Sequence, residues 1–208
     1  MALYNRSQDA QLYLDPIKKK DGLKITGEAR EGFAKLKKVT SNIEEAVSDA
    51  DIIFIATLAF AHDSEFLESA SYLKKGQVVM VDTSYCGCLR LANLARSKGF
   101  KKDIILWETS ILVYSCRIAG PAEVHVDGIK HEDLKAAALP SERTGEMFDA
   151  LKELYPSFIP DKNVLECDLE NLNFCSHTSI MILNIGRIEA SGGDFLFLPG
   201  GTTPPSAR

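Results

Sequence analysis

Two polar side chains, Asn173 and His177, interrupt an otherwise apolar stretch near the end of the chain. Residues four apart lie on one face of a helix, and Asn184 continues that face further along the chain. A polar stripe is costly unless each group finds a partner, so it often faces a cleft. A histidine can donate or accept a proton near neutral pH, and an amide can hydrogen-bond a substrate. The pattern makes His177 a candidate catalytic residue and Asn173 a candidate substrate ligand, with a hydrogen-bonded core histidine as the alternative.

The segment around these residues, from 169 to 190, has the period of one long helix that is apolar on most sides. An isolated helix is marginal in water, so these apolar sides need cover. The sequence reaches Arg208 before another helical segment follows. We therefore expect cover from residues outside this sequence or from a second copy, in a homodimer through this C-terminal helix.

Short apolar segments alternate with helix-like segments in the first half of the chain. Residues 51–56, 77–82 and 103–107 are almost continuously apolar, which is typical of strands covered by helices on both faces. Residues 63–73 and 89–98 have the pattern of the helices between these strands. This alternation predicts an α/β fold with a mainly parallel sheet.

Other elements are predicted on either side of these strands. Ser41 and Glu44 have the spacing of a capping box and predict a short helix ahead of the first apolar strand. Residues 122–129 alternate like a strand, and residues 142–154 have the period of an amphipathic helix. Residues 158–160 are expected to add a short edge strand.

The beginning of the chain is similar to the second strand of a dinucleotide-binding fold. Residues 3–7 are predicted to end a strand and residues 8–20 to form a helix that Pro16 weakens or ends early. The first strand of that fold and its Gly-x-Gly-x-x-Gly turn are expected upstream, and the sequence contains no such motif. We predict a Rossmann-like domain lacking its first β-α unit over residues 1–168, followed by the start of an all-α domain over 169–208.

Asn5, Arg6 and Ser7 follow this strand, where dinucleotide-binding folds recognise the adenosine ribose. An acidic residue there would bind the 2′-hydroxyl, whereas a neutral residue with an arginine suits a 2′-phosphate. The sequence therefore favours NADP over NAD as cofactor. A solvated strand end is the alternative.

The loop from Thr57 to His62 leaves the end of a buried strand, at the edge where open α/β sheets bind ligands. Small residues on both sides of Leu58 would let the backbone approach a cofactor. His62 is expected either to contact that cofactor or to cap the next helix.

Composition excludes several classes of protein. The 208 residues are 45% hydrophobic and 25% charged, as in an ordinary globular protein, and the net charge of -5 offers no basic field for a nucleic acid. No apolar run approaches the roughly 20 residues of a membrane-spanning helix, and the start is no secretory signal. Five irregularly spaced cysteines indicate reduced thiols in a cytoplasmic protein, and the Cys86-x-Cys88 pair lacks the partners of a metal site.

Several segments resemble the opine dehydrogenases, such as octopine and nopaline dehydrogenase, within the 6-phosphogluconate-dehydrogenase-like two-domain enzymes. The resemblance runs over nearly the whole chain and is clearest around Asn173, His177 and the segments that follow them. The similar segments are residues 3–6, 32–36, 39–40, 59–62, 108–109, 114–118, 120–121, 158–160, 163–166, 171–177, 183–189 and 192–197.

The resemblance implies reductive condensation of an amino acid with a 2-oxo acid, the imine being reduced by NAD(P)H, or the reverse oxidation. It implies that His177 is catalytic, that Asn173 lies in the substrate pocket, and that the loop from Thr57 to His62 lines the nicotinamide together with Glu108 and Thr109. The sequence departs from the family in lacking the glycine turn and the aspartate that pairs with the histidine. Leu58 and Thr178 also stand where relatives often have proline.

Other functions stay open on the sequence alone. One alternative is a dehydrogenase of the same superfamily that acts on a 2-hydroxy or 3-hydroxy acid. Another is a non-catalytic remnant or partner subunit that binds another chain through the helix around His177. Because the glycine turn is absent, we expect this polypeptide by itself to bind its cofactor weakly and to be inactive.

Overall fold

The computed structural model describes residues 1–82, 85–130, 132–152 and 154–196. The end of the chain from residue 197, including the last residue of the family-like segment 192–197, lies outside the described residues. The chain divides into two compact units, Met1–Asp168 and Leu169–Arg208.

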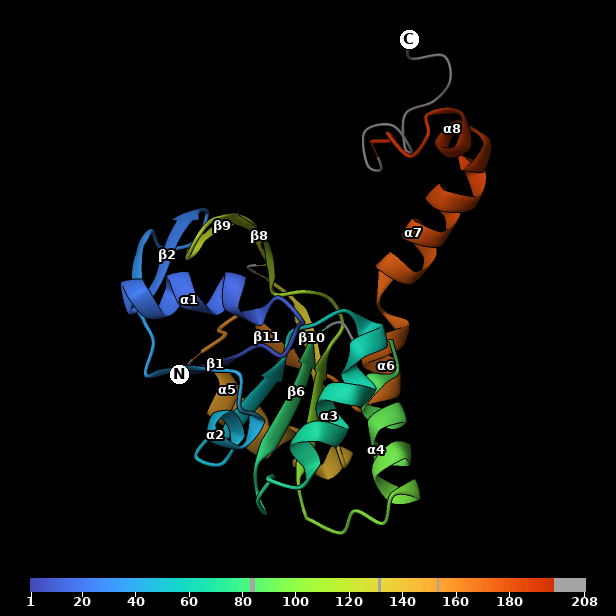
Figure 1. The fold of residues 1–208 in the computed structure, drawn as a ribbon. Helices are drawn as coiled ribbons and strands as arrows, with labels where there is room; N and C mark the ends of the chain where they lie inside the picture. The colour runs from blue at the N-terminus through green and yellow to red at the C-terminus, as the bar shows by residue number, and fades with distance from the viewer. Residues whose placement is uncertain (83–84, 131, 153, 197–208) are drawn as a thin grey trace. The chain divides into compact units, whose positions relative to one another are not determined.

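A five-stranded sheet with the order β11-β10-β7-β6-β5 forms the centre of the first unit (Figure 1). Neighbouring strands run parallel from β5 to β7 and between β10 and β11, whereas β7 and β10 are antiparallel. The prediction of an α/β fold with a mainly parallel sheet is therefore confirmed. The strands are β5 (Ile52–Ile55), β6 (Val78–Asp82), β7 (Ile105–Thr109), β10 (Leu134–Leu139) and β11 (Phe158–Pro160).

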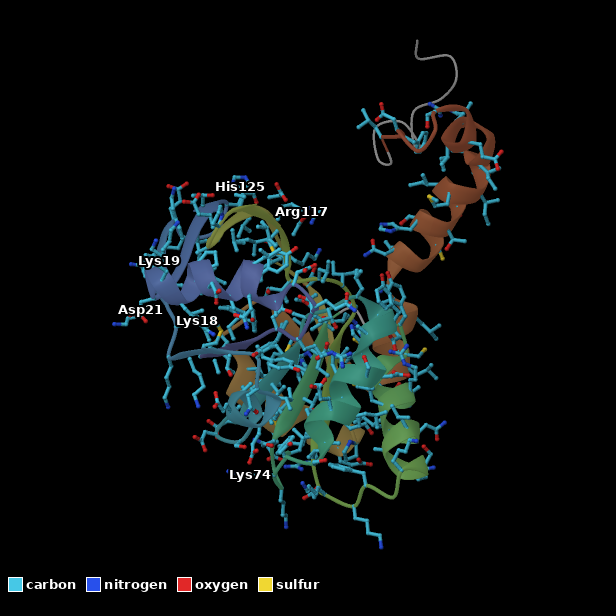
Figure 2. The ribbon with its side chains drawn as sticks, in the orientation of Figure 1. Lys18, Lys19, Asp21, Lys74, Arg117 and His125 are labelled. Atoms are coloured by element: carbon cyan, nitrogen blue, oxygen red, sulfur yellow. The ribbon has the colours of Figure 1, made fainter. Side chains whose placement is uncertain are left out.

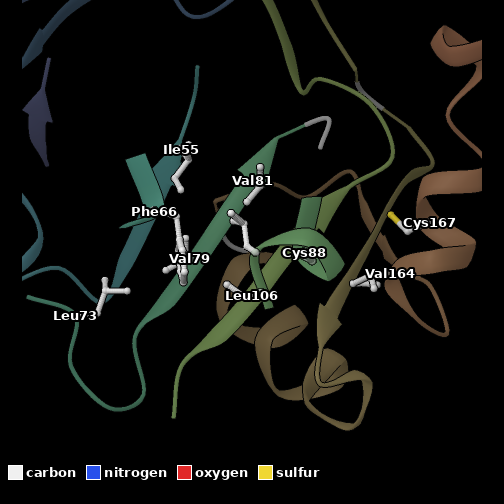
Figure 3. Close-up of a cluster of buried hydrophobic side chains, with 11 residues drawn as sticks. Ile55, Phe66, Leu73, Val79, Val81, Cys88, Leu106, Val164 and Cys167 are labelled. Atoms are coloured by element: carbon white, nitrogen blue, oxygen red, sulfur yellow. The ribbon is translucent and has the colours of Figure 1, made fainter. Parts of the chain in front are cut away.

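The central sheet is buried on both faces, which explains why its strands are continuously apolar. Val79 and Val81 of β6 pack in a cluster with Phe66 and Cys88, which come from two helices on one face (Figure 3). The alternate residues of β6 point to the other face, where they join a second cluster that contains Trp107 and side chains of a third helix. Burial of every second residue on each side fixes the register of the strands, because a slip of one residue would exchange the two faces.

Helices connect the strands and cover the sheet. Helices α3 and α4 lie on one face in Figure 1, and α5 contributes Met147 and Leu151 to the core of the other face. The short helix α2 is capped by Asn42, whose Oδ1 accepts the backbone N–H of Glu44 at 3.0 Å. The expected capping by Ser41 is therefore wrong, because the amide one residue later reaches the free N–H groups. The helices are α2 (Ile43–Val47), α3 (His62–Ala70), α4 (Gly87–Ser97), α5 (Thr144–Lys152) and α6 (Val164–Leu169).

The first strand of the chain, β1 (Ala2–Tyr4), pairs in parallel with β4 (Lys38–Thr40) in a separate two-stranded sheet. Helix α1 (Ala10–Lys20) follows β1 and contains Pro16 in its interior. The helix continues through this proline, because Leu14 and Ile17 on either side of it are buried and hold this turn of the helix in place. The expectation that Pro16 ends the helix early is wrong.

A second sheet, of order β3-β2-β9-β8, was predicted only at one of its strands. Its strands are β2 (Gly22–Gly27), β3 (Gly32–Lys35), β8 (Tyr114–Gly120) and β9 (Glu123–Ile129). In β9, the exposed His125 lies 3.0 Å from the Thr26 hydroxyl through its Nδ1 atom, and Figure 2 shows His125 and Arg117 on this sheet. Strand β8 has no apolar period because almost all of its residues are exposed, so the sequence carries no signal for it.

Up to residue 196, the second unit contains two helices rather than one. Helix α7 spans Leu172–Leu183 and helix α8 spans Ile185–Ala190. Asn184 separates them, since its side-chain amide donates to the Ile180 carbonyl at 2.9 Å instead of continuing the stripe of Asn173. The prediction of one continuous helix from 169 to 190 is wrong for this reason. Large apolar side chains of these helices are exposed, among them Leu172 at 76% and Leu183 at 81%.

Among the residues that the structure describes, no helix combines the length and the apolar character needed to cross a membrane.

The packing of α4 on the central sheet gives a direct test of the core. Leu91 is buried whereas Leu89 of the same helix is exposed. We expect Leu91→Ala to lower the free energy of unfolding by about 2–5 kcal/mol and Leu89→Ala by less than about 1 kcal/mol. Urea unfolding followed by circular dichroism measures both values. Equal losses in the two variants would contradict this placement of α4.

Candidate functional site

The carboxyl ends of β5, β6 and β7 meet at one edge of the central sheet because the three strands are parallel. Open α/β sheets bind ligands at this edge. The loop from Thr57 to His62 leaves β5 here, and β6 and β7 end here at Asp82 and Thr109. This edge therefore brings together five of the ten predicted site residues, Thr57, Leu58, His62, Glu108 and Thr109.

The loop after β5 presents its first residues to solvent. Thr57 is exposed, and the side chains of Leu58 and Phe60 are 69% and 85% exposed. Arg90 of α4 fixes the loop from below, since its Nη2 donates to the Ala59 carbonyl at 3.2 Å. Thr57 and Leu58 are thus placed where a ligand at this edge can be contacted.

His62 lies beneath the same loop and is completely buried. Its Nε2 atom is 2.9 Å from the Thr57 carbonyl oxygen, so the ring donates a hydrogen bond to the loop. Burial lowers the pKa of His62, although the hydrogen bond to Thr57 acts in the opposite direction. Nδ1 is buried and accepts no hydrogen bond from the described residues. A neutral His62 therefore braces the loop from inside.

Two carboxylates hold the N-terminus of α4. The backbone N–H of Cys86 donates to Asp168 Oδ2 at 2.7 Å, and the N–H of Cys88 donates to Glu108 Oε2 at 3.0 Å. Carboxylates are favoured at helix N-termini because the free N–H groups and the helix dipole are positive there. Tyr85 and Cys86 have left-handed backbone angles, with φ of 49° and 61°, which is strained for residues with a Cβ. The N-terminus of α4 is thus filled by the chain's own acids.

Thr109 braces the edge in a similar way. Its hydroxyl donates to Asp82 Oδ1 at 2.7 Å across the β6–β7 pair. Burial raises the pKa of Asp82, while this hydrogen bond and one from the Val113 backbone lower it. Glu108 and Thr109 are both buried, so the structure places these two predicted site residues under the edge and not on its surface.

Asn5, Arg6 and Ser7 form a turn at the end of β1. Asn5 Oδ1 accepts the backbone N–H of Ser7 at 2.8 Å. Arg6 makes two ion pairs with α3, through Nε to Glu65 at 2.9 Å and through Nη1 to Glu68 at 2.8 Å. The structure thus pairs Arg6, one of the three predicted ribose-binding residues, with α3, which the sequence did not indicate.

Asn173 and His177 belong to the second unit and lie on α7. The helix begins at Asn171, whose side chain accepts the Asn173 N–H at 3.0 Å. His177 is exposed and Asn173 is half-buried, one helical turn apart. Asn184, the third residue of the predicted stripe, is buried at the end of α7 and accepts a hydrogen bond from Arg187 at 2.7 Å.

Two site residues, Asp168 and Glu65, were not predicted from the sequence. Asp168 accepts a hydrogen bond from the backbone N–H of Cys86, 82 residues away in the sequence, and Glu65 accepts one from Arg6, 59 residues away. No local pattern signals contacts of this range. Within the described ranges, no group of three or more histidine, cysteine or acidic residues is arranged to hold a metal ion.

Comparison with known proteins relates the chain to dehydrogenases. No family model matches the sequence. The opine dehydrogenase of Arthrobacter sp. (strain 1C) is 31% identical over 197 residues, which are 94% of this chain and 54% of that protein. The chain therefore spans about half the length of the curated relative it matches.

Solved structures show the same fold. Octopine dehydrogenase with NADH and pyruvate has a TM-score of 0.68 and 20% identity over 94% of this chain and 51% of its own. Yersinopine dehydrogenase has a TM-score of 0.69 and 18% identity over 86% of this chain and 45% of its own, and another structure of it holds NADP+. Octopine dehydrogenase was also solved with L-arginine and with agmatine. Across nearly all of its length, this chain is similar in sequence to an opine dehydrogenase, and it shares the fold of octopine dehydrogenase.

Proposed function

We propose that this chain carries the dinucleotide-binding part and the first catalytic helix of an opine-type dehydrogenase. Residues 1–168 form the partial Rossmann-like domain, and residues 169–208 begin the helical domain. The proposed reaction reduces the imine of an amino acid and a 2-oxo acid with NADPH or NADH. The family relationship supports this assignment, and the relatives were solved with either cofactor.

The order of the parallel strands carries the proposal. In the dinucleotide-binding fold the strands follow the order 3-2-1-4-5-6 across the sheet. Strands β4 and β1 pair in the order expected of strands 3 and 2, and β5, β6 and β7 pair in the order expected of strands 4, 5 and 6. Among the described strands, β1 and β5 are not hydrogen-bonded to each other, and strand 1 of that fold belongs between them.

The carboxyl edge of β5 to β7 is the proposed nicotinamide side. Thr57 and Leu58 are the residues proposed to contact the cofactor, since both are exposed at this edge. Because His62, Glu108 and Thr109 are buried and hydrogen-bonded within the protein, their proposed role is to hold the edge in shape. The bound cofactor would supply the hydride.

His177 is the proposed acid–base residue because it is exposed on α7 and a histidine can transfer a proton near neutral pH. Asn173, one turn earlier, is the proposed ligand of the amino acid or oxo acid. The exposed apolar residues of α7 also suit the alternative of a subunit that only binds another chain. A dehydrogenase acting on a hydroxy acid would use the same cofactor edge.

Energy transfer from Trp107 to nicotinamide tests the proposal. Trp107 is the single tryptophan and lies in β7, so its emission reports a cofactor at the sheet. We expect saturable quenching by NADH or NADPH with weak affinity, on the order of 0.1–1 mM, because a glycine turn that would cradle the pyrophosphate is absent from the sequence. The same titration with free tryptophan in place of the protein is the control for inner-filter effects. No saturable signal with either cofactor would contradict the proposed dinucleotide site.

The buried state of His62 makes the stability of the chain depend on pH. Burial lowers its pKa in the folded state below the ordinary 6.5. On acidification the unfolded chain therefore takes up a proton at this histidine at a higher pH than the folded chain does. The contribution of His62 to stability is present above pH 6.5 and is lost as the pH falls from there through the lower pKa of the folded state. Urea midpoints measured above and below pH 6.5 should differ less in His62→Gln than in the parent chain.

His125→Gln is the matched control, because His125 is exposed on β9. This variant is expected to keep the full pH dependence of the parent. If His62→Gln loses stability with acid as steeply as the parent does, His62 is not the neutral brace of the loop.

A further inference from the structure

Arg6 stands at the end of β1, which on the proposed function is the strand that recognises the adenosine ribose of the cofactor. An arginine at this place ordinarily accommodates the 2′-phosphate of NADP. The contacts of this particular arginine decide whether it is available for that role.

All three guanidinium nitrogens of Arg6 donate to α3. Nε and Nη1 donate to Glu65 and Glu68 at 2.9 and 2.8 Å, and Nη2 donates to the Ser64 hydroxyl at 2.6 Å. The other oxygen of Glu68 accepts the Tyr4 hydroxyl at 2.8 Å. Burial, followed by the hydrogen bond and charge of Glu68, raises the pKa of Tyr4, so its hydroxyl stays a donor. The arginine is thus held in a fixed network.

The charges in this network oppose a phosphate. One guanidinium faces two carboxylates, so the group of Arg6, Glu65 and Glu68 has a net negative charge. A 2′-phosphate would have to compete with two charge-assisted pairs for Arg6 and would lie beside both acids. A 2′-hydroxyl is neutral and meets no such repulsion.

We propose that Glu65 and Glu68 are specificity-determining residues that hold Arg6 and make this chain select NADH over NADPH. The proposal rests on the proposed function, since it needs a dinucleotide at this edge. It reverses the preference that the residue types Asn5, Arg6 and Ser7 indicate by themselves, because the carboxylates that neutralise the arginine lie 59 and 62 residues away.

The test compares the Kd values of NADH and NADPH, measured by quenching of Trp107 in low salt. The parent chain is expected to bind NADH more tightly. The double variant Glu65→Gln with Glu68→Gln should shift the ratio of the two Kd values toward NADPH by roughly threefold to tenfold, the range for two partly exposed charge pairs. Higher salt should shrink the preference of the parent chain, because it screens exposed charges.

Glu132→Gln with Glu142→Gln is the matched control, since both residues are exposed acids and their loss changes the net charge equally. This control should leave the ratio within about twofold of the parent. If the double variant fails to fold, Glu65→Gln alone keeps the Tyr4–Glu68 hydrogen bond and should move the ratio in the same direction.

A parent chain that prefers NADPH, or a ratio that is the same in the parent chain and the double variant, overturns the specificity proposal and leaves the proposed function standing. Absence of binding by either cofactor to every form overturns both.

Discussion

Burial of the central sheet on both faces is the constraint on which the rest of the first unit depends. Every residue from Val78 to Val81 of β6 is buried, with alternate side chains directed at opposite helical layers. The helices must therefore return across the sheet after each parallel strand. This requirement places the starts of α3 and α4 at one edge, together with the loops that lead into them.

The polar groups under that edge follow from the same constraint. A helix that starts against a buried sheet needs partners for its free N–H groups, and Glu108 and Asp168 supply them for α4. His62 stabilises the loop before α3 by donating a hydrogen bond to the Thr57 carbonyl oxygen. These groups are used inside the protein, whereas Thr57, Leu58 and Phe60 of the loop after β5 are exposed at the edge.

The sequence predicted the elements that carry a local signal. The apolar runs at β5, β6 and β7 are found as expected, and the short strand β11 is confirmed at its predicted residues. The exposed strand β8 has no apolar period, and Asn42 competes with Ser41 for the same helix start. Strand β8 depends on the strand it pairs with, and the two candidate caps of α2 differ by one residue. Hydrophobic periodicity resolves neither.

The candidate site was predictable in its location and less so in its contacts. The edge of the sheet follows from the order of strands and helices, and the family resemblance is confirmed. The residue types at positions 5–7 indicated a phosphate, yet the partners of Arg6 are acids from a distant helix. His177 and Asn173 lie one turn apart on α7 as their spacing implies, and their catalytic roles stay predictions.

Amide hydrogen exchange with and without NADH tests the central claim most directly. We predict slower exchange in the loop from Thr57 to Ala61 and at Asn5 to Ser7 when NADH is present, with no change in β8 and β9 of the second sheet. Protection confined to β8 and β9, or no protection at the carboxyl edge at cofactor concentrations that saturate the Trp107 signal, would contradict it.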